Sequence, residues 1–244
     1  MLSRVAGIER KRGPAKDATA RSTRASLRST RCERAFNVIH ASSDLPLRCR
    51  CGRVRGVASG VSPSTGFRFV CYCADCQAFA RSLQRADILD SAGGTDIVQL
   101  PPGRVQLTAG IDAVQSLRFS NRVFRWYAAC CRTPIANTAF SPRFPIVGLV
   151  HAFIGVEAEG PSRNEILDEI LGPPLCRIYQ RSASGPLPGN APAPASFGVF
   201  VLRARKALGW WWRGLGRPNP FFDDRTGAPL FVPRVVTPGE RAAL

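Results

Sequence analysis

The middle of this chain, from about Leu45 to Val156, consists of short segments in which hydrophobic and polar positions alternate. The hydrophobic positions two residues apart are Phe67, Phe69, Cys71 and Cys73, then Val105 and Leu107, Leu117 and Phe119, and Phe124 and Trp126. Glycine and proline residues separate these segments. Because successive side chains of a strand point to opposite faces, the pattern predicts strands joined by turns in an antiparallel β unit.

A longer apolar run at residues 144–156 ends this unit and predicts a buried strand. Pro145 and Gly148 interrupt the run, and it is shorter than the roughly 20 apolar residues that a membrane-spanning helix needs. The sequence therefore predicts no transmembrane segment.

The first of two predicted helices follows the β unit. Ser162 and Glu165 have the spacing of a capping box, and Gly172 with the two prolines after it ends the helix. Residues 182–196 then predict a linker, because 13 of these 15 positions are Pro, Gly, Ser or Ala.

The second helix is predicted from Ser196 to about Leu215. Its apolar stripe consists of Phe197, Val201, Ala204, Leu208, Trp211, Trp212 and Leu215. Such a stripe is typical of a helix that docks on a hydrophobic core, so we expect it to pack on the β unit. The alternative is that this basic, tryptophan-containing helix lies on an anionic membrane surface.

These patterns divide the chain into three parts. Residues 1–44 form a basic leader that is expected to be disordered, or to reflect a start codon assigned too far upstream. The leader lacks the apolar stretch of a secretory signal, so a cytoplasmic protein is expected. Residues 45–156 form the β domain, and residues 157–244 form a C-terminal extension with both helices and the linker. The predicted fold class is mainly β, and α+β overall.

The chain is strongly basic, with 34 Lys and Arg against 17 acidic residues and a net charge of +17. The excess lies at the two ends, since residues 1–40 and residues 177–244 each carry 10 basic and 3 acidic side chains. The middle is nearly balanced. We therefore favour a solvated basic surface over a nucleic-acid partner.

Cysteine is the residue type that points to chemistry. Seven of the nine cysteines fall in three clusters, which are Cys49 and Cys51, then Cys71, Cys73 and Cys76, then Cys130 and Cys131. A disulfide scaffold is typical of short secreted chains, whereas thiolates in clusters at this spacing are typical of metal ligands. Cys32 and Cys176 stand apart and are interpreted as incidental.

The seven clustered cysteines divide naturally into four and three. Cys49, Cys51, Cys130 and Cys131 predict a closed four-sulfur structural zinc site. Cys71, Cys73 and Cys76 predict a second zinc with its fourth position open, as in catalytic sites. Flanking arginines at positions 48, 50, 53, 55 and 132 would offset the thiolate charge. One zinc with spare cysteines, an iron–sulfur cluster, and buried thiols without a metal remain as alternatives.

At these motifs the chain resembles the family of glutathione-dependent formaldehyde-activating enzyme and centromere protein V. Cys49-Arg-Cys51-Gly52 matches the first family motif, and Cys71-Tyr-Cys73-Ala-Asp-Cys76 matches the second. Cys131-Arg-Thr-Pro-Ile135 matches the end of the third. The third motif departs from the pattern, because Ala128 stands where the family has a cysteine and Cys130 has to substitute for it.

The resemblance implies an Mss4-like zinc-bound β fold and about two zinc ions per chain, divided four and three as above. It also implies a carbon–sulfur lyase activity of the S-hydroxymethylglutathione synthase kind. In that reaction a small thiol such as glutathione is activated at the zinc of Cys71, Cys73 and Cys76.

Two rival functions stay open beside this carbon–sulfur lyase. One is a non-catalytic zinc module that binds a protein or nucleic acid, and the other is peripheral membrane association through residues 196–215. The sequence predicts neither the exact substrate nor the oligomeric state.

Overall fold

The computed structural model describes residues 42–155 and 163–244. This part of the chain is mainly β and α+β overall, as predicted. The strands are β1 (Ser43–Arg48), β2 (Arg55–Val61), β3 (Phe67–Cys71), β4 (Thr95–Leu100), β5 (Val105–Ala109), β6 (Val114–Arg118), β7 (Val123–Ala128), β8 (Thr133–Ala139), β9 (Val147–Val150), β10 (Cys176–Ile178) and β11 (Arg234–Val235). The helices are α2 (Ala74–Ser82), α3 (Arg163–Leu171), α4 (Phe197–Trp212) and α5 (Pro238–Ala242).

The strands form two sheets. The smaller sheet has the antiparallel order β1-β2-β5, and the larger has the order β10-β3-β4-β9-β8-β7-β6-β11. Both edge strands of the larger sheet come from the C-terminal part of the chain and run parallel to their neighbours. Cys176 of β10 lies opposite Phe69 of β3, and Arg234 of β11 lies opposite Leu117 of β6.

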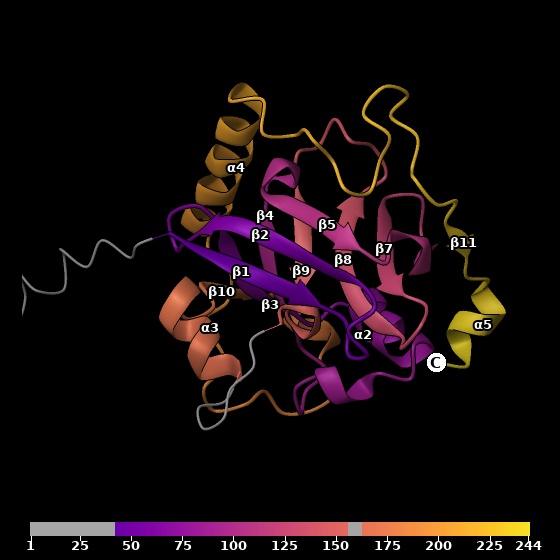
Figure 1. Ribbon diagram of the computed structural model, residues 1–244. Helices are drawn as coiled ribbons and strands as arrows, with labels where there is room; N and C mark the ends of the chain where they lie inside the picture. The colour runs from indigo at the N-terminus through magenta and orange to yellow at the C-terminus, as the bar shows by residue number, and fades with distance from the viewer. Residues whose placement is uncertain (1–41, 156–162) are drawn as a thin grey trace, which may run out of the picture. The chain divides into compact units, whose positions relative to one another are not determined.

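The main hydrophobic core lies between the two sheets (Figure 1). Leu45 and Leu47 of β1 face it because every second residue of that strand is buried. Trp126 of β7 is fully buried there and stacks on Phe221, with ring centroids 4.9 Å apart. The small sheet therefore covers one face of the large sheet. The opposite face packs on α2, where Phe79 lies in a second cluster.

The predicted strands are found as β3, β5, β6 and β7, except that Cys73 and Phe119 lie just beyond the ends of β3 and β6. The apolar run 144–156 differs from the prediction, because only Val147–Val150 is a strand and residues 151–153 form a 3-10 turn. This turn carries Phe153 and Ile154 into the core between the sheets, where both are fully buried. His151 is hydrogen-bonded, with its Nδ1 3.2 Å from the carbonyl oxygen of Asp96.

Helix α4 begins where it was predicted, because the side chain of Ser196 accepts a hydrogen bond from the backbone N–H of Val199. The prediction that its apolar stripe packs on the β unit was wrong. The face that docks carries Arg203 and Trp210, and Arg203 Nε donates to Gln99 Oε1 at 2.8 Å. Polar acceptors on this part of the sheet bind the basic face of the helix, so the apolar stripe points outward.

The division into three domains stays a prediction. Residues 1–41, with Cys32 and His40, lie outside the described residues, and so do the predicted domain boundary at 156 and the cap at Ser162. Within the described residues, the stretch predicted as a linker is hydrogen-bonded to the sheet. Arg177 of β10 donates its backbone N–H to the carbonyl of Ala193, and its own carbonyl accepts from the backbone N–H of Ala195.

Candidate metal centres

Four cysteines meet where two turns of the chain approach each other. Cys49 and Cys51 lie in the turn between β1 and β2, and Cys130 and Cys131 lie in the turn between β7 and β8. Their sulfur atoms all lie within 4.8 Å of one another. The Cys51–Cys130 distance is 3.3 Å, the Cys49–Cys51 distance 3.6 Å, and the Cys49–Cys130 distance 3.9 Å. Sulfur atoms bound tetrahedrally to zinc at about 2.3 Å are about 3.8 Å apart, so this group could hold a metal ion.

The first turn, rather than an extended strand, brings Cys49 and Cys51 together. The backbone N–H of Gly52 donates to the carbonyl of Cys49 at 2.9 Å, and Gly52 adopts φ +77°, which glycine reaches without strain. The backbone N–H of Val54 then donates to the sulfur of Cys49 at 3.2 Å. A turn, and not the alternation of an extended strand, therefore makes the two sulfur atoms converge.

The geometry of the second turn explains how the neighbouring residues Cys130 and Cys131 can face one ion. Ala128 pairs with Thr133 at the end of the β7–β8 hairpin, so residues 129–132 form the turn. Arg132 adopts φ +57° within it. The chain reverses direction in this turn, and the sulfur atom of Cys130 thereby joins those of the other three cysteines. Ala128 is buried at the end of β7.

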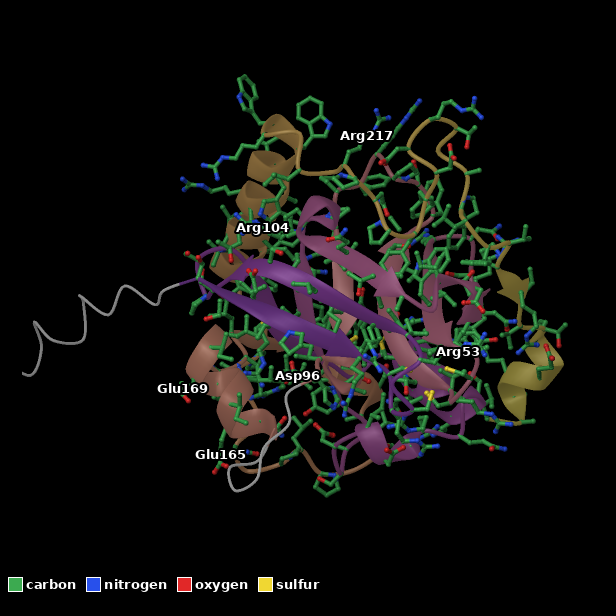
Figure 2. All side chains as sticks on the ribbon, in the orientation of Figure 1. Arg53, Asp96, Arg104, Glu165, Glu169 and Arg217 are labelled. Atoms are coloured by element: carbon green, nitrogen blue, oxygen red, sulfur yellow. The ribbon has the colours of Figure 1, made fainter. Side chains whose placement is uncertain are left out.

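The four thiols of this group differ in their acidity. Burial raises the pKa of Cys49 and of Cys130. Burial also acts to raise the pKa of Cys131. The hydrogen bonds of Cys131 with the Thr133 hydroxyl and with the other cysteines outweigh burial and lower this pKa to about 6. Arg53 extends beside these sulfur atoms, where Figure 2 labels it, and forms an ion pair with Asp112.

Three further cysteines meet where β3 passes into α2. Cys71 is the last residue of β3, Cys73 is the N-cap of α2, and Cys76 lies in the first turn of that helix. Their sulfur atoms also lie within 4.8 Å of one another, so a second group could hold a metal ion. The backbone N–H of Cys76 donates to the sulfur of Cys73 at 3.4 Å. This is the usual N-cap contact, here made to a sulfur atom.

The hydrogen bonds within the three-cysteine group concentrate negative charge on Cys73. Donation from Cys71 and Cys76 lowers the pKa of Cys73 to about 2, and the bond to Cys73 raises the pKa of Cys71. The N-terminus of α2 adds a positive end of a helix dipole at the same place. A divalent cation bound here would displace the thiol protons of the group.

A buried arginine that the sequence analysis missed completes this group. Arg125 of β7 donates to the sulfur of Cys76 at 3.5 Å and to Asn137 Oδ1 at 3.0 Å, and its side chain is 5% exposed. Although desolvation acts to lower it, the charge on Cys76 raises the pKa of Arg125. In the sequence, Arg125 stands out as a charged residue between Phe124 and Trp126 on an otherwise apolar strand.

The three-cysteine group opens on a cavity of about 580 Å³. The residues that matter at its wall are Cys71, Cys73, Cys76, Arg125, Gln99 and Arg203. Its floor is apolar and includes Phe67, Phe69 and Ile97, and α4 forms part of the rim. A metal ion held by only three protein sulfurs at this wall would face the cavity.

The comparison with known families gives one match. The chain matches the model of a family of unknown function, DUF6151, over residues 41–231. The chain belongs to this family. No curated protein matches it. The matched range includes all seven clustered cysteines and helix α4. Both cysteine groups therefore lie in the part of this DUF6151 protein that matches the family model.

Two residues that the sequence analysis left aside lie near the three-cysteine group. Cys176 of β10 is buried in the same apolar cluster and lines the cavity, outside the group of converging sulfur atoms. Asp75 of α2 pairs with Arg241 at 2.6 Å and lies 3.9 Å from Arg125. Asp75 therefore anchors the C-terminal helix α5 instead of standing free on the surface.

A second cavity, of about 470 Å³, contains no cysteine. Its acidic residues are Asp87, Asp90, Asp96 and Asp168. Each accepts hydrogen bonds within the protein, for example Asp90 from Tyr72 and Asp96 from Arg68. These carboxylates are committed to the fold, and the thiol groups are the better candidates for chemistry.

Proposed function

We propose that this protein binds two zinc ions and uses one of them in the addition of a small thiol to an aldehyde. The observation that carries the proposal is the three-cysteine group at the wall of a cavity, with a buried arginine in contact with Cys76. The sequence resemblance to formaldehyde-activating enzymes supports the same reading. The four-cysteine group is assigned to the second, structural zinc.

The structural assignment follows from where the four cysteines come from. Cys51 and Cys130 lie 79 positions apart in the chain and belong to different sheets, and their sulfur atoms are 3.3 Å apart. A metal ion at this point would connect the small sheet with the large sheet. Since four sulfur ligands fill a tetrahedral shell, the ion would stabilise the fold and leave no position for a substrate.

The reactive assignment follows from an incomplete ligand set. Cys71, Cys73 and Cys76 would hold the zinc, which would supply a Lewis acid with one position for a substrate thiol and would lower the pKa of that thiol. Arg125 would offset the net negative charge of three thiolates and a divalent cation. The sulfur of the substrate is thereby presented to the cavity as a nucleophile.

The residues across the cavity position the rest of the substrate. Arg203 and Gln99 form one polar pair at the wall, and Arg122 lies on the same cavity. These donors suit the carboxylates of a peptide-like thiol. In the reaction the thiolate sulfur forms a bond to the carbonyl carbon of the aldehyde. The carbonyl π pair takes the proton that the thiol released, and the product is a hydroxyalkyl thioether.

Metal content and spectroscopy of the full chain test the proposal. We expect two zinc ions per chain, one lost in Cys73→Ser and the other lost in Cys51→Ser. In the cobalt-substituted protein, adding glutathione should change the ligand-field spectrum of wild type and of Cys51→Ser. It should leave Cys73→Ser unchanged. Consumption of formaldehyde with glutathione then measures turnover.

The matched pair of serine variants makes the outcome decisive. A single zinc per chain, or a loss of both ions in Cys73→Ser, contradicts the two-site assignment. If adding glutathione leaves the cobalt spectrum unchanged, the three-cysteine site is closed to thiols. The proposed reaction is then refuted even if both metals are present.

A further inference from the structure

Helix α4 docks on the protein through its polar side. Val199, Arg203, Lys206 and Trp210 recur at intervals of four, three and four residues and therefore share one face. Arg203 donates to Gln99, Lys206 donates to the carbonyl of Ser64, and Trp210 is 7% exposed. Val199 packs on the apolar cluster around Cys71. This face fixes the orientation of the helix on the sheet.

The opposite face of α4 is apolar and exposed. At about 100° per residue, its members fall within an arc of about 120° that contains no charged side chain. They are Phe197, Phe200, Val201, Ala204, Leu208, Trp211 and Trp212. Phe197 is 82% exposed and Trp212 83%, and Leu208 is 62% exposed. We call these seven residues the outward face.

A second exposed aromatic pair lies beside the C-terminal end of α4. Phe140 and Phe144, in the loop between β8 and β9, have ring centroids 6.1 Å apart and are each more than half exposed. A Cβ on Gly216, just after the helix, would lie 3.4 Å from Pro145. This loop therefore adjoins the end of the helix that carries Trp211 and Trp212.

The charged side chains of α4 and of the residues just after it are all positive. Residues 197–217 include five basic side chains and no acidic one. Arg205 is exposed beside the apolar arc, Arg213 is exposed at the C-cap of the helix, and Arg143 is exposed between the two phenylalanines. Figure 2 shows Arg217, beyond the end of α4, pointing away from the protein. The nearest acidic residues along the chain, Asp223 and Asp224, follow in the next loop.

We propose that the outward face of α4 is a docking surface for the anionic surface of a lipid bilayer. Tryptophan and phenylalanine at the interface, aliphatic side chains below them and arginines around them match the apolar and charged zones of such a surface. A second copy of the chain would bring like charge against like charge. A nucleic acid would leave Val201 and Leu208 without a partner.

The helix lies on the bilayer and does not cross it. With 16 residues α4 is about 24 Å long. Among residues 42–155 and 163–244, the structure contains no helix with the length and apolar character to span a membrane. Binding through this face adds an interaction surface to the protein and does not depend on the metal sites or on the proposed reaction.

Co-sedimentation of the full chain with vesicles tests this proposal. We expect binding to vesicles of phosphatidylcholine with phosphatidylglycerol and weaker binding to phosphatidylcholine alone. The double variant Leu208→Glu with Trp212→Glu should lower the partition coefficient at least tenfold. The matched control is Leu175→Glu with Val232→Glu, which changes the net charge equally at exposed apolar residues elsewhere. It should bind like wild type.

Tryptophan fluorescence reports where the contact is made. Trp126 and Trp210 are buried, so a blue shift on adding vesicles has to come from Trp211 and Trp212, and brominated lipids should quench it. If both double variants lose vesicle binding equally, the loss is a general effect of charge and the proposal is overturned. Absence of vesicle binding would also overturn it, whether or not the chain then proves to be a dimer through α4.

Discussion

Arg125 gives the sharpest test of how the three-cysteine group is built. Its guanidinium nitrogen lies 3.5 Å from the sulfur of Cys76, and the side chain is almost completely buried. Asp75 lies 3.9 Å away and is held at 2.6 Å by Arg241, so the thiolates are the main counter-charge of Arg125. Replacing Arg125 with methionine removes this charge and keeps much of the apolar stem.

The magnitude follows from the distance. Two unit charges about 4.5 Å apart attract each other by about 4 kcal/mol at an effective dielectric constant of about 20. The variant also removes the cost of burying a guanidinium, which offsets part of this loss. We therefore expect Arg125→Met to weaken zinc binding at the three-cysteine group about 10- to 100-fold, with Arg125→Lys between the variant and wild type.

The assay is competition for zinc with a chromophoric chelator, which resolves the two ions when their affinities differ. The control is Arg53→Met, since Arg53 lies beside the four-cysteine group but is 57% exposed and screened by solvent. This control should leave both affinities unchanged. An unaltered three-cysteine affinity in Arg125→Met, in a variant that folds by circular dichroism, would refute the electrostatic reasoning.

Two further predictions concern the fold. Arg68 is buried and bridges Asp96 at 2.7 Å and Asp168 at 2.6 Å, so Arg68→Met should lower the free energy of unfolding in urea by about 3–5 kcal/mol; a loss below about 1 kcal/mol would contradict it. Burial, together with the hydrogen bond to Asp90, raises the pKa of Tyr72 above its ordinary value of 10.0. Because the folded state favours the protonated phenol, this contribution is present below pH 10 and is lost as the pH rises above it. Absorbance at 295 nm should show one late-titrating tyrosine that Tyr72→Phe removes.

The strands and the grouping of the cysteines could be predicted because both depend on local spacing. Alternation at Phe67, Phe69 and Cys71 is enough to place β3, and clustered thiols at metal-site spacing indicate ligands. The route by which Cys130 and Cys131 face one point could not be predicted. It depends on the reversal of the chain at Arg132, and nothing in the residue types announces a left-handed backbone there.

Arg125 was missed for a different reason. A charged residue on an alternating strand is ordinarily assigned to solvent, and that assignment holds when one face of the sheet is open. Here the small sheet covers one face of β7 and α2 covers the other, so both faces are buried. The alternation predicts which residues share a face, and only the packing of the sheets decides whether that face is exposed to solvent.

Helix α4 shows the same limit and connects the two proposals. Its periodicity predicts which side chains lie together, but the polar acceptors on Gln99 and Ser64 decide which face turns inward. Val199 and Arg203 consequently line the thiol cavity while Leu208 and Trp212 point away from it. Leu208 and Trp212 do not line the cavity, whereas Phe200 of the outward face does. Substitutions at Leu208 and Trp212 therefore leave the cavity wall intact, and membrane binding and thiol chemistry can fail independently.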